Sequence, residues 1–172
     1  MKVGFVSLGC AKNLVDSEYI IGIFDDPFFT YEQDLKKCDV IVINTCGFIQ
    51  SAKEETIDTI LEFAEYKQYN LKKLIVTGCF VERYFDDCVA EFPEVDLFVK
   101  ISDYSQLADK LSELLNHKLI NTYGKNRKLV NNNYTAYLKI SDGCDNRCAY
   151  CAIPLIRGNN KSYPIEDLVK EA

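Results

Sequence analysis

Short apolar runs alternate with longer amphipathic stretches over residues 1–116. Continuous apolar runs are typical of strands covered on both faces of a parallel sheet. Stretches in which apolar residues recur every three or four positions are typical of helices that cover such a sheet. The alternation predicts an α/β fold with a parallel sheet. The expected strands are 2–8, 39–44, 73–77 and 96–99, and the expected helices are 13–24, 51–66, 81–90 and 104–115.

The pattern changes after residue 116. Residues 117–133 are polar and rich in asparagine, with one glycine and a short basic run, which is typical of a linker. Residues 134–140 then predict a new strand, a cysteine-rich loop follows, and residues 164–172 predict the start of a helix. We therefore expect an α/β domain at 1–116, a linker at 117–133 and the incomplete start of a second domain at 134–172.

Composition narrows the class of protein. The chain has 172 residues, of which 48% are apolar and 27% charged, as in ordinary globular domains. Its net charge of -6 provides no general electrostatic attraction for phosphate backbones, so we expect no nucleic-acid partner. We expect a cytoplasmic protein without a membrane segment, because the sequence shows neither a signal peptide nor an apolar run of about 18 residues. In a reducing compartment, its eight cysteines are more typical of metal or catalytic sites than of disulfides.

Three cysteines share one position relative to the expected strands. Cys10, Cys46 and Cys79 each follow the end of a strand, and a glycine adjoins each of them. Because the carboxyl ends of parallel strands meet at one edge of the sheet, neighbouring strands would bring these thiols together. A structural zinc site normally has four ligands, whereas a cubane iron–sulfur cluster on three cysteines leaves one iron open. The pattern therefore favours an iron–sulfur cluster at this edge.

Free cysteines also occur as small buried apolar residues, an explanation that suits one cysteine better than three equivalent ones. Cys38 precedes a strand and Cys88 lies in or near a helix, so we expect both to be packing residues. His117 is the only histidine, and its place at the start of the linker makes it a poor fourth ligand. The polar residues at 11–13 and 16–18 fit either helix capping and solvation or a role in lining the site.

A second group of cysteines is compact. Cys144, Cys148 and Cys151 have the spacing C-x3-C-x2-C directly after an expected strand. A short loop with this spacing can hold a cubane cluster from one side and leave its fourth iron open to a bidentate ligand. The aromatic Tyr150 beside the last cysteine can cover such a cluster. A zinc knuckle is the alternative for this loop.

This loop resembles the signature of the radical S-adenosylmethionine superfamily, and the whole chain resembles the methylthiotransferases within it. The matching segments are 7–18, 44–49, 77–79 and 139–158. The resemblance implies an amino-terminal, Rossmann-like parallel-sheet domain followed by the first βα unit of a partial (β/α) barrel. The residues around Cys10 and Cys46 are similar to the RimO-type branch, which modifies an aspartate of the small-subunit ribosomal protein uS12. The branch that modifies tRNA is the alternative.

The resemblance also implies the cofactors, which are two 4Fe-4S clusters and S-adenosyl-L-methionine. The second cluster would bind S-adenosylmethionine at its open iron and pass the electron that cleaves it, giving a radical that takes hydrogen from the aspartate. The first cluster would carry the sulfur that is methylated and transferred. Tyr150, Ile153 and Arg157 are expected to line the cofactor, although Arg157 also fits a solvated loop charge. The implied partners are uS12 or the small ribosomal subunit, and a reductant protein such as flavodoxin or ferredoxin.

Two features depart from the family pattern. The chain stops at Ala172, whereas a (β/α) barrel needs many more units than one. We therefore expect this polypeptide alone to be inactive and to expose an unfinished strand edge. Residues 159–164 are less basic than the family pattern, which leaves cofactor and substrate contacts there open. A non-catalytic iron–sulfur or zinc-binding module is a further alternative.

Overall fold

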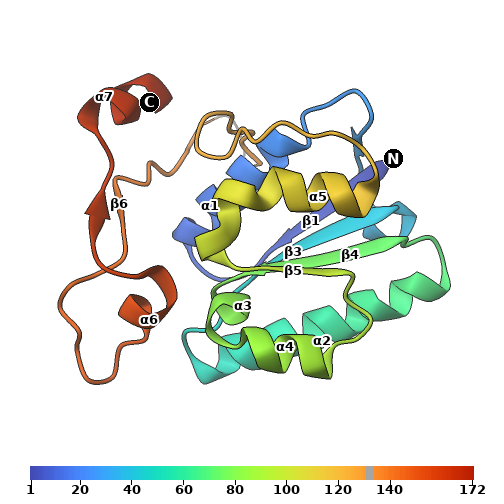
Figure 1. The fold of residues 1–172 in the computed structure, drawn as a ribbon, viewed down its shortest axis with the longest axis horizontal. Helices are drawn as coiled ribbons and strands as arrows, with labels where there is room; N and C mark the ends of the chain where they lie inside the picture. The colour runs from blue at the N-terminus through green and yellow to red at the C-terminus, as the bar shows by residue number, and fades with distance from the viewer. Residues whose placement is uncertain (131–133) are drawn as a thin grey trace.

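A parallel sheet forms the centre of the protein in the computed structural model, which describes residues 1–130 and 134–172 (Figure 1). Five strands lie in the order β2-β1-β3-β4-β5, and all four pairings between them are parallel. The strands are β1 (Lys2–Ser7), β2 (Thr30–Tyr31), β3 (Val40–Thr45), β4 (Lys73–Gly78) and β5 (Leu97–Val99). The predicted α/β fold with a parallel sheet is confirmed.

Helices cover both faces of this sheet. Figure 1 shows α1 and α5 over one face and α2 and α4 over the other. The helices are α1 (Ala11–Ile23), α2 (Gln50–Glu65), α3 (Cys79–Arg83), α4 (Phe85–Glu91) and α5 (Leu107–Leu115). The single helix expected over 81–90 is wrong in detail, because Tyr84 leaves the helical conformation and separates α3 from α4. The helix expected over 104–115 begins with the 3-10 turn Ile101–Gln106.

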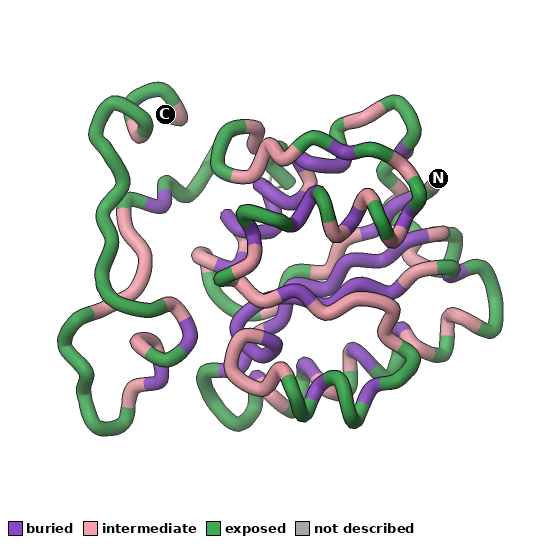
Figure 2. Tube along the Cα trace, in the orientation of Figure 1, coloured by how far each residue is buried: buried purple, intermediate pink, exposed green. Residues whose placement is uncertain are grey.

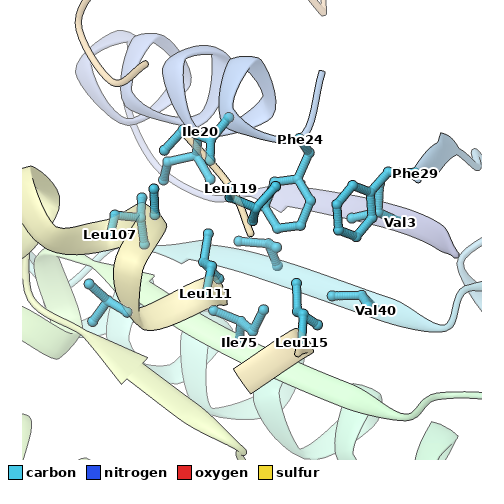
Figure 3. Packing of buried hydrophobic residues seen from close by; sticks show 14 of the residues in the cluster. Val3, Ile20, Phe24, Phe29, Val40, Ile75, Leu107, Leu111, Leu115 and Leu119 are labelled. Carbon is cyan, nitrogen blue, oxygen red and sulfur yellow. The ribbon is translucent and has the colours of Figure 1, made fainter. Parts of the chain in front are cut away.

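The central strand β3 begins with four apolar residues in a row, Val40–Ile43. All six of its residues are buried, because β1 and β4 flank it and helices cover both of its faces. Alternate residues serve the two faces. On one face, Val40 and Val42 pack with apolar side chains of α1 and α5 (Figure 3). On the other, Ile41 and Ile43 pack with Ile60 of α2.

The register of the sheet brings three strand ends level with one another. Ser7 of β1 lies beside Asn44 of β3, and Asn44 lies beside Thr77 of β4. The residues that follow these three strands therefore emerge at one edge of the sheet. This is the edge at which ligands of open parallel sheets commonly bind.

The carboxyl-terminal part has little regular structure and is largely exposed (Figure 2). Its elements are β6 (Ser141–Asp142), α6 (Ile153–Arg157), β7 (Lys161–Ser162) and α7 (Ile165–Glu171). The helix expected from residue 164 is confirmed as α7. The strand expected over 134–140 is wrong, since pairing in this part of the described chain is limited to the short antiparallel pair β6–β7. The first βα unit of a barrel stays a prediction.

Residues 117–130 of the expected linker pack along α1. Leu119 is buried in the apolar core, and the ring of Tyr123 lies against the rings of Tyr19 and Tyr104. Residues 131–133 of that linker lie outside the described residues, and the division into domains stays a prediction. In the described part of the chain, every helix is too short or too polar to cross a membrane.

Candidate functional site

Cys10, Cys46 and Cys79 come together at the carboxyl edge of the sheet. Cys10 directly precedes α1, Cys46 follows β3, and Cys79 is the first residue of α3. The amide oxygen Oδ1 of Asn13 lies 3.7 Å from Cys10 Sγ and 3.5 Å from Cys79 Sγ. Cys46 Sγ is so near to Gly9 that a Cβ built on this glycine would lie 2.8 Å from the sulfur and 3.6 Å from Asn13 Nδ2. Two of the thiols thus contact the side chain of Asn13, and the third lies beside Gly9 at the same edge.

Buried hydrogen bonds hold this centre in place. Asn13 is fully buried, and its Nδ2 donates to the carbonyl of Thr45 at 2.7 Å. Asn44 Nδ2 donates to the carbonyl of Asn13 at 2.7 Å and to Ser17 Oγ at 2.9 Å. Thr56 Oγ1 donates to the carbonyl of Cys46 at 2.8 Å. The start of α1 is therefore fixed to the end of β3, and Cys46 is fixed to α2.

Two glycines at this edge have backbone conformations that other residues rarely adopt. Gly9 has φ +89° and Gly78 has φ +103°. A Cβ on Gly78 would lie 2.5 Å from backbone atoms of Thr45, and a Cβ on Gly9 would lie 2.7 Å from Cys46 Cβ. Glycine is required at both positions because it has no Cβ to strain the backbone or to displace its neighbours.

The second group of cysteines lies in a single loop. Cys144 N donates to the carbonyl of Gly158 at 3.1 Å, which closes the loop at its base. Within it, Cys151 N donates to the carbonyl of Cys148 at 3.0 Å. Cys148 is exposed, whereas Cys144 and Cys151 are partly buried. Tyr150 is 88% exposed, so its ring faces solvent beside the cysteines.

Helix α6 connects the two groups. It begins at Ile153, two residues after Cys151, and packs against α3. Ala152 and Ile156 bury their apolar surface against Cys79. The loop with the second group of cysteines is thereby held next to a ligand candidate of the first group.

Arg157 ends α6, and its guanidinium points into the first group of cysteines. Its side chain is only 2% exposed. Nη2 lies 3.5 Å from Cys79 Sγ and 3.1 Å from Asn13 Oδ1. Nη1 lies 2.8 Å from Asp16 Oδ2 and 2.9 Å from Asp142 Oδ2. The structure thus places Arg157 beside Cys79, with carboxylates on its other side.

Asp16 is the centre of a buried ionic network. Lys139 Nζ lies 2.5 Å from Asp16 Oδ1, and the hydroxyl of Tyr123 donates to the same oxygen at 2.8 Å. Burial is the largest single influence and lowers the pKa of Lys139 and of Arg157, but the charges of Asp16 and Asp142 together with the hydrogen bonds of the network raise both by more in total, so both pKa values lie above their usual range. Both side chains therefore remain cations inside the protein.

The same guanidinium acts on the Cys79 thiol. Burial raises the pKa of this thiol, and the charge and hydrogen bond of Arg157 oppose that rise only in part. The neighbouring Cys46 and Cys10 raise it further. Without a bound group, Cys79 is accordingly a neutral thiol at neutral pH. A positively charged metal centre would be needed to bind it as a thiolate.

The donor set suits a cluster better than a single ion. Among residues 1–130 and 134–172, no three Cys, His, Asp or Glu side chains converge closely enough to hold one metal ion. Zinc needs donors at about 2.0–2.3 Å. The thiols of Cys10 and Cys79 instead both contact Oδ1 of Asn13, at 3.7 and 3.5 Å. A cubane spreads its cysteine ligands over different irons, so it does not require three thiols to meet at one ion.

The remaining candidates lie elsewhere. Cys38 and Cys88 are buried in the apolar core, which confirms them as packing residues. The ring of His117 stacks on Phe28, with 4.1 Å between ring centroids, and lies 3.2 Å from Asp26. These contacts account for the position of the His117 ring, and no metal is needed to explain it.

The polar residues at the start of α1 were open to two explanations. Asn13, Asp16, Ser17 and Glu18 are all buried, with at most 3% exposure. Asn13 contacts the thiols of Cys10 and Cys79, and Asp16 contacts Arg157 beside them, so both lie at the edge that carries these cysteines. The available signal was their spacing, since positions 13, 16 and 17 share one face of a helix that starts at the sheet edge.

Fold and site together define a parallel α/β domain with a cysteine-lined site at the carboxyl edge of its sheet. The model of the family described as "Uncharacterized protein family UPF0004" matches residues 2–100, and the chain belongs to this family.

Curated relatives match nearly the whole chain. A protein of Alkaliphilus oremlandii is 50% identical over 100% of this chain and 40% of its own length. A protein of Acetivibrio thermocellus is 47% identical over 99% of this chain and 41% of its own length. A third, from a Sulfurihydrogenibium species, is 47% identical over 100% of this chain and 39% of its own. Each is named "Ribosomal protein uS12 methylthiotransferase RimO". The chain thus spans about two fifths of the length of these relatives.

Proposed function

We propose that this chain carries the cluster-binding part of an enzyme that methylthiolates an aspartate of ribosomal protein uS12 by radical S-adenosylmethionine chemistry. The names of the relatives support methylthiotransfer and uS12 as the protein modified. The observation that carries the proposal is that three thiols from three separate strand ends lie at one edge of the sheet, two of them on Asn13 and the third beside Gly9. Packing alone does not explain why three cysteines share this edge.

Each group of cysteines has its own task in this proposal. Cys10, Cys46 and Cys79 hold one 4Fe-4S cluster, and Cys144, Cys148 and Cys151 hold the other. When bound, the second cluster supplies the open iron for S-adenosylmethionine and the electron that cleaves it. Gly9 and Gly78 allow the backbone to approach the first cluster closely.

The structure of the second loop supports a role in binding a cofactor. Its base is closed by hydrogen bonds while Cys148 stays exposed, so thiols can be offered from one side without opening the fold. Tyr150 lies exposed beside the cysteines and can cover the bound group. Ile153 starts the helix that sets the distance between the two groups.

Anaerobic reconstitution with ferrous iron and sulfide tests the metal content. We expect about eight irons and eight sulfides per chain, as two cubanes require. Replacing Cys10, Cys46 and Cys79 by alanine should halve both, and so should replacing Cys144, Cys148 and Cys151. Replacing the buried Cys38 and Cys88 is the matched control, which should leave the iron content unchanged. One zinc per chain without sulfide would contradict the proposal and favour a zinc-binding module.

The substrate is tested with this chain and, in parallel, with the full-length relative from Alkaliphilus oremlandii. A uS12 peptide that contains the target aspartate, S-adenosylmethionine and a flavodoxin-type reductant should give a methylthiolated peptide, detected by mass spectrometry. A tRNA substrate is the parallel arm. Modification of tRNA with no change in the peptide would contradict the assignment to uS12.

A further inference from the structure

We propose that Arg157 is a positioning residue of the first cysteine site, and that it raises the reduction potential of a cluster held there. Its guanidinium would donate a hydrogen bond to the bound Cys79 thiolate. This inference rests on the proposed function, because it requires a cluster on Cys10, Cys46 and Cys79. It concerns a residue that lies in sequence beside the other group of cysteines.

The contact with sulfur is specific to this side chain. Nη2 lies 3.5 Å from Cys79 Sγ, and no other cation in the described part of the chain makes a hydrogen bond to any of the three sulfurs. The side chain of Arg157 is 2% exposed, so water does not weaken the interaction. A buried cation that touches one of three thiols is placed to act on whatever those thiols bind.

The geometry of the guanidinium directs it at the sulfur. Nη1 faces the carboxylates of Asp16 and Asp142 at 2.8 and 2.9 Å, and both residues are fixed by other bonds in the network. Because the guanidinium is planar and rigid, fixing Nη1 also fixes the direction of Nη2. A lysine has a single nitrogen and is unable to satisfy the carboxylates and the sulfur in this way.

The effect on the potential follows from charge. Hydrogen bonds to the sulfurs are among the factors that set the potential of an iron–sulfur cluster. Reduction adds one negative charge to the cluster, so a cation that donates to a ligand sulfur stabilises the reduced form more than the oxidised form. Removing Arg157 should therefore lower the reduction potential of the first cluster.

The test uses the reconstituted chain in which Cys144, Cys148 and Cys151 are alanine, so that only the first cluster is present. Its midpoint potential is measured by redox titration followed by EPR. We expect the potential to fall in the order wild-type Arg157, then Arg157→Lys, then Arg157→Met, with iron and sulfide content unchanged. An unchanged potential with the cluster bound would overturn the inference while leaving the proposed function intact.

Two further variants separate this role from a general effect of charge and from unfolding. Lys139→Met removes a buried cation of the same network that makes no hydrogen bond to sulfur, and it should lower the potential less than Arg157→Met. An equal fall of the reduction potential in Lys139→Met and Arg157→Met would overturn the specific role of Arg157. The double variant Asp16→Asn/Arg157→Met removes a buried charge of each sign, so the potential can be measured even where the single variant unfolds. Absence of iron and sulfide from the first site in the otherwise unchanged chain would instead refute the proposed function and this inference with it.

Discussion

Arg127 and Glu18 form a buried ion pair that joins residues 117–130 to helix α1. Arg127 Nη2 and Nε donate to Glu18 Oε2 at 2.6 and 2.8 Å, and Val130 N donates to Glu18 Oε1 at 3.2 Å. Nη1 of the same arginine lies 2.6 Å from Glu171 of α7. A segment with the composition of a linker is thus part of the folded structure, since its arginine is paired only while it packs on α1 and α7.

Arg127→Met should destabilise the protein by about 3–5 kcal/mol, because it leaves the buried carboxylate of Glu18 without a counter-ion. The free energy of unfolding is measured by urea denaturation followed by circular dichroism. Lys128→Met is the matched control. The Lys128–Asp25 pair is about half exposed on both sides, so its loss should cost about 0–1 kcal/mol. Equal losses in the two variants would show that the Arg127–Glu18 pair does not hold the segment.

Gly9→Ala should displace Cys46 and reduce the iron bound by the first group of cysteines. The new Cβ would lie 2.8 Å from Cys46 Sγ, at a backbone φ of +89°. Gly124→Ala is the control, because Gly124 also has positive φ, +77°, but a Cβ there meets nothing within 4 Å. That control should lower the free energy of unfolding by about 1–2 kcal/mol through backbone strain. Its iron content should stay unchanged. Iron analysis after reconstitution in the Cys144, Cys148 and Cys151 alanine background compares the two, and full iron in Gly9→Ala would contradict the crowding argument.

The sheet and the first group of cysteines were predictable because their signals are local. β3 and β4 are short apolar runs, and a strand buried on both faces needs such a run. Once the strands are parallel and adjacent, the geometry of the sheet places Cys10, Cys46 and Cys79 at one edge. No contact between distant residues had to be foreseen for this step.

The ionic network was not predictable in the same way. Arg157 meets Asp16 across nearly the whole length of the chain, and no periodicity links an arginine at the end of one helix to an aspartate in another. The strand expected over 134–140 failed for a related reason. An alternating apolar pattern shows that a segment suits a sheet, but a strand forms only where a partner strand lies beside it, and the pairing here is limited to β6 and β7.

The two packing cysteines should resist alkylation. Burial raises the pKa of Cys38 to about 11 and that of Cys88 to about 12, with nearby carboxylates adding to the rise. The thiolate is the reactive form, so iodoacetamide at about pH 8 should modify the exposed Cys148 first and these two last. Mass spectrometry of tryptic peptides measures the order. Rapid alkylation of Cys38 or Cys88 in the native protein would contradict their burial.

The same raised pKa values give a direction for the dependence of stability on pH. The unfolded thiols ionise near pH 9.0, whereas the folded thiol of Cys88 ionises near 12. Its contribution to stability is therefore complete below pH 9 and is lost as the pH rises from 9 towards 12. Cys88→Ala should lose less stability than the wild type over this window in urea denaturation. Parallel curves for the two proteins would show that Cys88 does not contribute to the alkaline loss.

Tyr123→Phe should reveal how strongly the buried carboxylate of Asp16 depends on the hydroxyl of Tyr123. The hydroxyl donates to Asp16 Oδ1 at 2.8 Å, and burial together with Asp16 raises the pKa of Tyr123 well above its usual range. The phenylalanine ring keeps the packing against Tyr19 and Tyr104, so the loss isolates the hydrogen bond. We expect a cost of about 1.5–3 kcal/mol, as for a hydrogen bond to a charged group.

A double-mutant cycle with Asp16→Asn assigns this cost to the pair. The two substitutions should be non-additive by at least about 0.5 kcal/mol in the free energy of unfolding, because they remove the two ends of one interaction. Ser112→Ala, which removes a hydroxyl bonded to the carbonyl of Ala108 in α5, is the control and should be additive with Asp16→Asn. If Tyr123→Phe were equally additive, its hydroxyl would not stabilise the carboxylate that holds Arg157 against the first group of cysteines.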